Sequence, residues 1–119
     1  MELNDYQKEA MKFAKYSDVE YPFLALTEEV GEVMGKLAKF VRKESVSVSD
    51  AIIYANSSFD KETKGLKAGL KKELGDVLWQ LQACCNELGL SLEDVAKSNL
   101  DKLSGRDERG TIVGEGDER

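Results

Sequence analysis

The sequence contains no histidine, and this absence excludes several classes of site. Ser-His and Cys-His catalysis, zinc sites with histidine ligands and the Glu-x-x-His di-iron bundle all require an imidazole. Acid–base or metal chemistry in this chain must therefore come from carboxylates, lysine, tyrosine or water. Oxygen ligands of this kind favour Mg²⁺, and Mn²⁺ is a suitable substitute.

Proline, cysteine and long hydrophobic runs are also scarce. The single proline and the stretches rich in Glu, Lys, Leu and Ala favour helices. Cys84 and Cys85 are adjacent in an apolar stretch, which predicts reduced thiols and no disulfide or redox site. No apolar run reaches the roughly 20 residues that cross a bilayer, and the first residues lack the regions of a signal peptide. We therefore expect a cytoplasmic protein with no membrane partner.

The chain is short and acidic. Its 119 residues fit one domain, and its net charge is −6. An acidic chain is a poor match for duplex nucleic acid, whose partners usually present a basic surface. A nucleotide remains a suitable ligand, provided that a cation mediates the contact.

Hydrophobic periodicity predicts an all-α fold with four main helices. They cover about residues 5–16, 22–43, 61–88 and 91–104, with Asn4, Pro22 and Ser91 at their starts and Gly89 after the third. The segment 44–64 is less regular, and Ser49 or Asp50 is a candidate cap for a short helix over 50–55. Residues 1–104 are predicted to form the domain, and residues 105–119 a glycine-rich polar tail.

Each predicted helix carries an apolar stripe. A single subunit has too few helices to bury every stripe and also enclose a ligand. We therefore expect a four-helix bundle that is completed by oligomerisation, as a homodimer or a homotetramer.

Carboxylates recur in one pattern on two of the predicted helices. Each copy reads Glu, a branched apolar residue, Gly and an acid, and the acids concerned are Glu29 with Glu32 and Glu73 with Asp76. Glu28 precedes the first copy. Residues three or four apart share a helix face, so each pair lies on one side of its helix.

This pattern is costly for a helix. Like charges at such spacing destabilise it by about 0.2–0.5 kcal/mol per pair, and an interior glycine costs roughly 1 kcal/mol. If the helices pack antiparallel, Gly31 and Gly75 would permit close approach and the four acids would converge. A divalent cation would then offset the repulsion. A solvated acidic surface is the alternative, and it is less suited to two matched pairs beside the core.

With Glu28-Glu29-x-x-Glu32 and Glu73-x-x-Asp76, the chain resembles the MazG-like branch of the all-α nucleoside triphosphate pyrophosphohydrolases. The signature of that family is E-E-x-x-E, a spacer, and E-x-x-D. The spacer is somewhat long here. The resemblance extends from residue 4 to about residue 110 and includes the stretch Asn99–Arg106 at the end of the fourth helix.

The resemblance implies Mg²⁺-dependent hydrolysis of a nucleoside triphosphate between its α- and β-phosphates. It makes Glu29, Glu32, Glu73 and Asp76 the metal ligands, while Glu28 would support them or orient the attacking water. It also implies that Asn99 and Lys102 contact the substrate. Arg106 is suited to a bidentate phosphate contact, although a cation near a helix C-terminus is equally favoured by the helix dipole.

Two other functions stay open at this point. Related branches suggest strict specificity for one substrate, such as dUTP or a modified dCTP. A non-catalytic helical interaction module is an alternative of a different class. The sequence leaves open the preferred base and sugar, the number of metal ions and the choice between dimer and tetramer.

Overall fold

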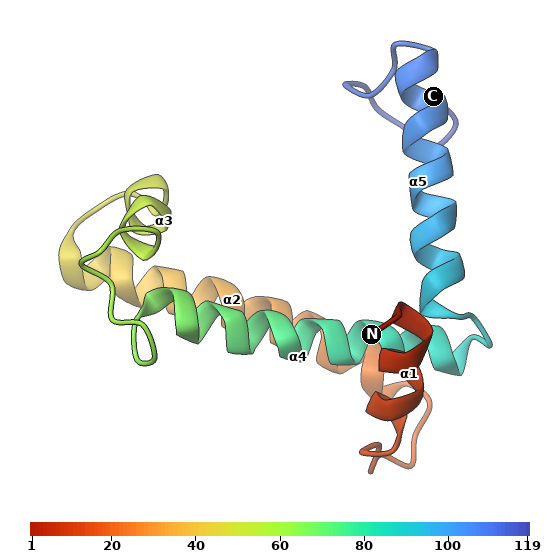
Figure 1. The fold of residues 1–119 in the computed structure, drawn as a ribbon, viewed down its shortest axis with the longest axis horizontal. Coiled ribbons are helices and arrows are strands. Elements are labelled where there is room, and N and C mark those ends of the chain that lie inside the picture. The colour runs from red at the N-terminus through yellow and green to blue at the C-terminus, as the bar shows by residue number, and fades with distance from the viewer. The chain divides into compact units, whose positions relative to one another are not determined.

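The computed structural model describes residues 1–119 and contains five α-helices and no strand, which confirms the all-α class (Figure 1). The helices are α1 (Leu3–Met11), α2 (Tyr21–Glu44), α3 (Val48–Ala55), α4 (Leu66–Glu87) and α5 (Leu92–Glu108). The chain divides into two compact units, one formed by Lys15–Cys84 and the other by Met1–Ala14 together with Cys85–Arg119. None of the five helices is both long enough and apolar enough to cross a membrane.

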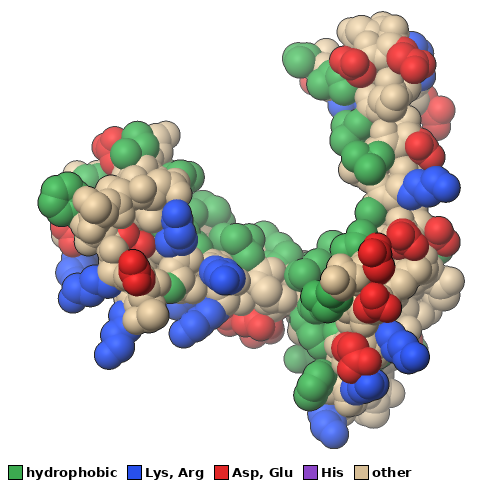
Figure 2. All heavy atoms as spheres, viewed as in Figure 1, with side chains coloured by type: hydrophobic (Ala, Val, Ile, Leu, Met, Phe, Trp, Pro, Cys, Tyr) green, Lys and Arg blue, Asp and Glu red, His purple; other side chains and the backbone are tan.

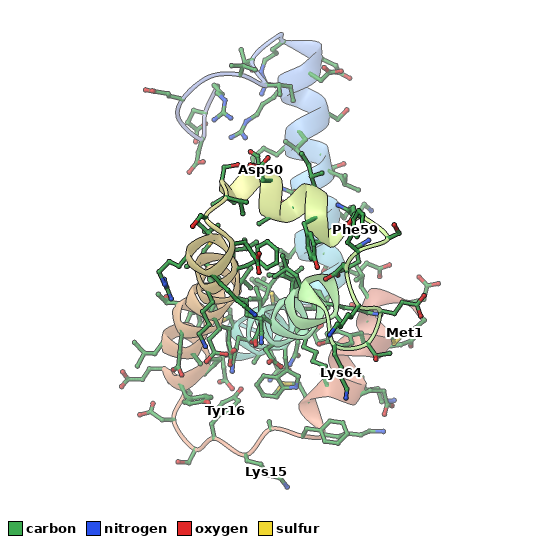
Figure 3. The ribbon with its side chains drawn as sticks, turned by 90° about the vertical axis from the view of Figure 1, so that its left-hand side faces the viewer. Met1, Lys15, Tyr16, Asp50, Phe59 and Lys64 are labelled. Carbon is green, nitrogen blue, oxygen red and sulfur yellow. The ribbon has the colours of Figure 1, made fainter.

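The unit Lys15–Cys84 is built on α2 and α4, which run antiparallel side by side (Figures 1 and 3). The short helix α3 packs on α2, where the rings of Phe40 and Tyr54 lie 4.8 Å apart. Ala51 and Ala55 are buried at this contact, since small side chains let the two helices approach. This arrangement places the middle of α2 opposite the middle of α4, where the carboxylates lie.

The apolar stripe of α4 is less buried than the sequence predicts. Leu74, Leu78 and Leu81 share a helix face and are 55%, 38% and 38% exposed. Val30 and Met34 on α2 are also about half exposed. The three leucines and Val30 were predicted from periodicity to face a core, but no helix of the same unit covers them.

The starts of α2 and α3 follow from local chemistry. Pro22 occupies the first turn of α2, as predicted, where its missing N–H has no helical partner to lose. The helix ends where Ser45 adopts a left-handed conformation with φ 54°. The hydroxyl of Ser47, not Ser49 or Asp50, then caps α3 by accepting a hydrogen bond from the backbone N–H of Asp50 at 3.0 Å.

Helix α4 begins at Leu66, five residues later than the sequence predicts. The carboxylate of Asp60 accepts hydrogen bonds from the backbone N–H groups of Leu66 at 2.8 Å and Lys67 at 3.1 Å. Gly65 is required beside it, because a Cβ there would collide with the carbonyl of Lys61 and the carboxylate of Asp60. A side chain from the loop therefore caps the helix across six residues, which periodicity cannot reveal.

We expect Asp60→Ala to lower the free energy of unfolding by about 1 kcal/mol, because two amides in the first turn of α4 lose their acceptor. Denaturant unfolding followed by circular dichroism measures the change. Glu62→Ala in the same loop is the control and should leave the stability unchanged. Equal stability of the two variants would show that this cap contributes nothing.

In the other unit, side chains of α1 hold the turn between α4 and α5. The amide of Gln7 donates to the carbonyl of Leu90 at 3.0 Å and accepts from the N–H of Leu92 at 2.8 Å. Asn4 was predicted to cap the first helix, but its side chain bonds to Glu93 instead. The helix therefore starts at Leu3 and ends at Met11, with a capping box formed by Glu2 and Asp5.

The predicted turn between α4 and α5 is confirmed. Gly89 follows α4 with a positive φ of 68°, which favours glycine. The hydroxyl of Ser91 accepts a hydrogen bond from the N–H of Asp94 at 3.0 Å and so caps α5.

Helix α5 continues four residues past its predicted end and stops at Glu108. The tail that follows folds back on this end, because the guanidinium groups of Arg106 and Arg109 donate to the carbonyls of Asp117 and Arg119. The division into a domain over 1–104 and a tail over 105–119 stays a prediction, and its boundary falls inside α5.

Candidate metal and catalytic centre

Three of the predicted ligands meet where α2 and α4 run side by side. Carboxylate oxygens of Glu29 and Glu32 from α2 and Glu73 from α4 all lie within 4.8 Å of one another. Glu29 and Glu32 are one turn apart on α2, and the antiparallel α4 presents Glu73 to them. The side chain of Glu73 is only 15% exposed. The structure thus brings together carboxylates that are about 40 residues apart in the sequence.

The electrostatics of the cluster are those of crowded negative charge. Partial burial raises the pKa of Glu29 above its ordinary value of 4.5, and the charges of Asp76, Glu28 and Glu73 raise it further. The pKa of Glu32 is also raised, first by a hydrogen bond with Glu73 and then by the charge of Glu29. The crowding of negative charge thus makes the protonated form of Glu32 easier to form than that of an isolated glutamate.

Glu28 and Asp76 lie at the edge of the three-carboxylate cluster. The charge of Asp76 acts on Glu29, and the charge of Glu28 acts on both Glu29 and Glu32. Both are exposed. Their side chains are therefore close enough to join the site, although neither belongs to the group of oxygens within 4.8 Å.

Two further side chains support the cluster and were missed as parts of the site. The ammonium of Lys36 lies 3.4 Å from Glu73. The side-chain amide of Gln80 donates a hydrogen bond to Glu29, and this bond lowers the pKa of that carboxyl against the larger effects that raise it. The sequence does carry a signal for Lys36, since it lies one helical turn after Glu32 and therefore on the same face of α2. Nothing in the sequence distinguishes Gln80 from a surface amide, but it is buried and its Oε1 has no partner.

The prediction that Gly31 and Gly75 allow the two helices to approach closely is wrong. Both are exposed, and a Cβ built on either would meet nothing within 4 Å. The glycine that does permit close approach is Gly69, where a Cβ would lie 3.2 Å from Cδ of Lys36. The helices come together through the stem of Lys36 against Gly69, one turn before Glu73, and this directs the ammonium towards the carboxylates.

Aromatic rings lie beyond the carboxylates along the same helix pair. Tyr16 stacks on Tyr21 at the start of α2, with ring centroids 5.6 Å apart, and meets the edge of Trp79 on α4 at 6.4 Å. Trp79 is partly buried. Three kinds of side chain therefore follow one another along α2: aromatic, acidic and, from Lys36 onwards, basic.

The predicted substrate contacts Asn99, Lys102 and Arg106 belong to α5, in the other unit. Asn99 and Lys102 line one hollow with Asp94 and Ser98. Arg106 is buried, and its Nη2 lies 3.3 Å from the carbonyl oxygen and 3.9 Å from the carboxylate of Asp117 in the tail. The guanidinium that was predicted to contact phosphate is therefore held by the tail in this structure.

The oxygen donors of the cluster fit a hard divalent cation. Glu29, Glu32 and Glu73 offer carboxylate oxygens at mutual distances that one ion can bridge. Asp76 lies outside this group, but its charge acts on Glu29. A bound cation would take the place of the Lys36 ammonium as the balancing positive charge. Such an ion neutralises phosphate charge and makes water more acidic.

We expect Mg²⁺ to bind more weakly as the pH falls from about 7 towards about 5. The pKa values of Glu29 and Glu32 are raised, so protons stabilise the folded protein at low pH, and this contribution is lost as the pH rises through the raised pKa. A cation needs the deprotonated carboxylates and thus competes with these protons. Calorimetric titration at several pH values measures the effect, and an affinity that is flat over this range would contradict it.

Comparison with known proteins agrees with this geometry. Residues 20–111 match the model of the MazG nucleotide pyrophosphohydrolase domain. The chain is also similar to the Gene 37 protein of Mycobacterium phage L5, with 34% identity over 99 residues that cover 83% of this chain and 75% of the phage protein. No solved structure shows a significant match.

Proposed function

This chain belongs to the MazG nucleotide pyrophosphohydrolase family, and on this basis we propose that it hydrolyses nucleoside or deoxynucleoside triphosphates with Mg²⁺ as cofactor. The products would be the nucleoside monophosphate and pyrophosphate, so the enzyme would clean or shape the nucleotide pool. The observation that carries this proposal is the convergence of Glu29, Glu32 and Glu73 within 4.8 Å inside the matched region.

In the proposed site, Glu29, Glu32, Glu73 and Asp76 hold the cation. A triphosphate carries several negative charges and would be repelled by these carboxylates without it. Lys36 and Gln80 are positioning residues, because they contact Glu73 and Glu29 and fix the direction of these ligands. Glu28 is exposed beside Glu29 and is the group that we assign to the attacking water.

In the proposed reaction, water displaces pyrophosphate from the α-phosphorus. The oxygen of water bonds to the α-phosphorus, and the bond from that phosphorus to the oxygen bridging the α- and β-phosphates breaks. The bridging oxygen leaves with pyrophosphate, and the water proton passes to Glu28 and then to solvent. Positioning and charge neutralisation account for most of the catalysis in reactions of this type.

Asn99 and Lys102 remain the proposed substrate contacts on α5. Both are exposed and line the same hollow, so a phosphate or ribose oxygen can reach them. Arg106 would have to leave Asp117 before it could bind phosphate. We therefore assign Arg106 to the substrate only in a state in which the tail has moved.

A second copy of the chain is the proposed partner, as a homodimer or a homotetramer. Exposed apolar side chains of α2 and α4 form a band along one edge of the helix pair, visible in Figure 2; they include Val30, Met34, Leu74, Leu78 and Leu81. Beside them Gln82 is fully buried, and neither its Oε1 nor its Nε2 has a hydrogen-bond partner. Packing this band against the same band of a second copy would remove the exposed apolar surface of these leucines from water, and this burial would stabilise the dimer.

The experiment that tests the function is pyrophosphate release from a panel of ribo- and deoxyribonucleoside triphosphates, with Mg²⁺ and with a chelator. We expect release only with Mg²⁺, in amounts equal to the monophosphate formed. The panel also ranks the bases and would reveal a strict preference for dUTP or a dCTP derivative. If no nucleotide releases pyrophosphate and Mg²⁺ has no effect on stability, the chain is a helical interaction module instead.

A further inference from the structure

A basic groove lies next to the carboxylate cluster, at the end of the helix pair near α3. We call it the lysine groove; it is lined by Lys36, Lys39 and Lys43 of α2, by Lys64 in the loop before α4, and by Lys72 and Phe40. Its volume is about 420 Å³. Figure 2 shows blue side chains gathered at this end of the helix pair, and Figure 3 shows Lys64 in the loop that leads into α4.

The charge of the groove is unusual for this chain. Acidic residues outnumber basic ones by 23 to 17 over the whole sequence, yet five lysines and no carboxylate line the groove. Lys36, Lys39 and Lys43 are spaced by three and four residues, so they share one face of α2 and repel one another. Of the nearby acids, Glu73 pairs with Lys36 alone and Asp60 is already bound to the backbone amides of α4. Glu44 lies in the adjoining hollow. A polyanion would relieve this repulsion.

The groove has space for a ligand, and small residues contribute to its lining. Gly65 and Gly69 line it together with Thr63, while Phe40 and Leu66 close its apolar side. A side chain at Gly69 would press on the stem of Lys36.

Lys36 connects the groove to the metal site. Its ammonium lies 3.4 Å from Glu73, while its stem lines the groove. Lys72 precedes Glu73 in the sequence and also lines the groove. A ligand that bridges the two sites would carry one phosphate at the carboxylates and the next ones among the lysines.

We propose that the lysine groove binds an oligophosphate, namely the β- and γ-phosphates of the substrate and then the pyrophosphate that leaves. This inference rests on the proposed function for the identity of the substrate, but the affinity for oligophosphate does not depend on hydrolysis. The aromatic rings, the carboxylates and the lysines follow one another along the helix pair in the order of a base, an α-phosphate and a terminal diphosphate.

The test begins with binding of inorganic tripolyphosphate in the presence of a metal chelator, measured by calorimetry at low salt. Wild type should bind it, and the triple variant K39Q/K43Q/K64Q should bind at least about tenfold more weakly, because three charge-assisted contacts are lost. The matched control K8Q/K15Q/K97Q removes the same charge from exposed lysines outside the groove and should stay within about twofold of wild type. Unchanged binding by the groove variant would overturn the proposal.

Kinetics then identify the source of the phosphates. If the groove holds the substrate, K39Q/K43Q/K64Q raises KM for the triphosphate by about tenfold and changes kcat little. If tripolyphosphate binding is lost but KM is unchanged, the groove binds a free oligophosphate. The single variants K39Q and K64Q, checked by circular dichroism, replace the triple variant if it fails to fold.

Hydrolysis and groove binding can fail separately. Tripolyphosphate binding that requires the groove lysines, in a protein that hydrolyses no nucleotide, would support the groove and contradict the proposed reaction. Normal hydrolysis with no oligophosphate binding by wild type would support the proposed reaction and contradict the role of the groove.

Discussion

The substitution Glu73→Gln is expected to lower kcat/KM for nucleoside triphosphate hydrolysis by roughly a thousandfold. The amide keeps the shape of the side chain but removes the charge that binds the cation. It also ends the ion pair with Lys36. Steady-state rates of pyrophosphate release at saturating Mg²⁺ measure the loss.

A control and a second readout make this prediction specific. Glu108→Gln removes an equal charge from the exposed end of α5 and should keep the wild-type rate. Mg²⁺ together with nucleotide should raise the melting temperature of wild type and of Glu108→Gln but not that of Glu73→Gln. A Glu73→Gln protein with the activity of wild type would contradict the assignment of this carboxylate.

If copies associate through the apolar band as proposed, Leu78→Glu is expected to give a monomer, with the dissociation constant raised by roughly a thousandfold or more. Leu78 lies in the middle of the exposed band on α4, between Leu74 and Leu81. In a symmetric interface each copy would bring its own carboxylate, so association would have to desolvate two like charges. Light scattering coupled to gel filtration measures the mass.

Val113→Glu is the matched control for this change. Val113 is 97% exposed in the tail, so a charge there should leave the mass unchanged. If wild type is monomeric at every concentration tested, or if Leu78→Glu has the mass of wild type, the apolar band is not the interface between copies.

Local sequence signals located the helices well where one residue determines the boundary. Pro22 marks the start of α2, Gly89 the end of α4 and Ser91 the start of α5, because each acts on its own backbone or on amides within three residues. The start of α4 was missed because its cap, Asp60, is a loop side chain six residues away. Asn4 was misassigned because its bond to Glu93 depends on tertiary structure.

The candidate site shows the same division between local and tertiary information. Spacing along two helices was enough to predict that Glu29, Glu32 and Glu73 meet, since each pair of acids lies on one helix face. Spacing could not show that Gln80 is buried against Glu29, or that Gly69 rather than Gly31 or Gly75 admits a neighbouring side chain. The position of Arg106 depends on how the tail folds back, which no periodicity encodes.

The most direct test of the central claim is hydrolysis of a nucleoside triphosphate by the wild-type protein in ¹⁸O-labelled water with Mg²⁺, with the products analysed by mass spectrometry. Attack of water on the α-phosphorus predicts one labelled oxygen in the nucleoside monophosphate and none in the pyrophosphate. Label in pyrophosphate or in inorganic phosphate, or the absence of any Mg²⁺-dependent product, would contradict the account.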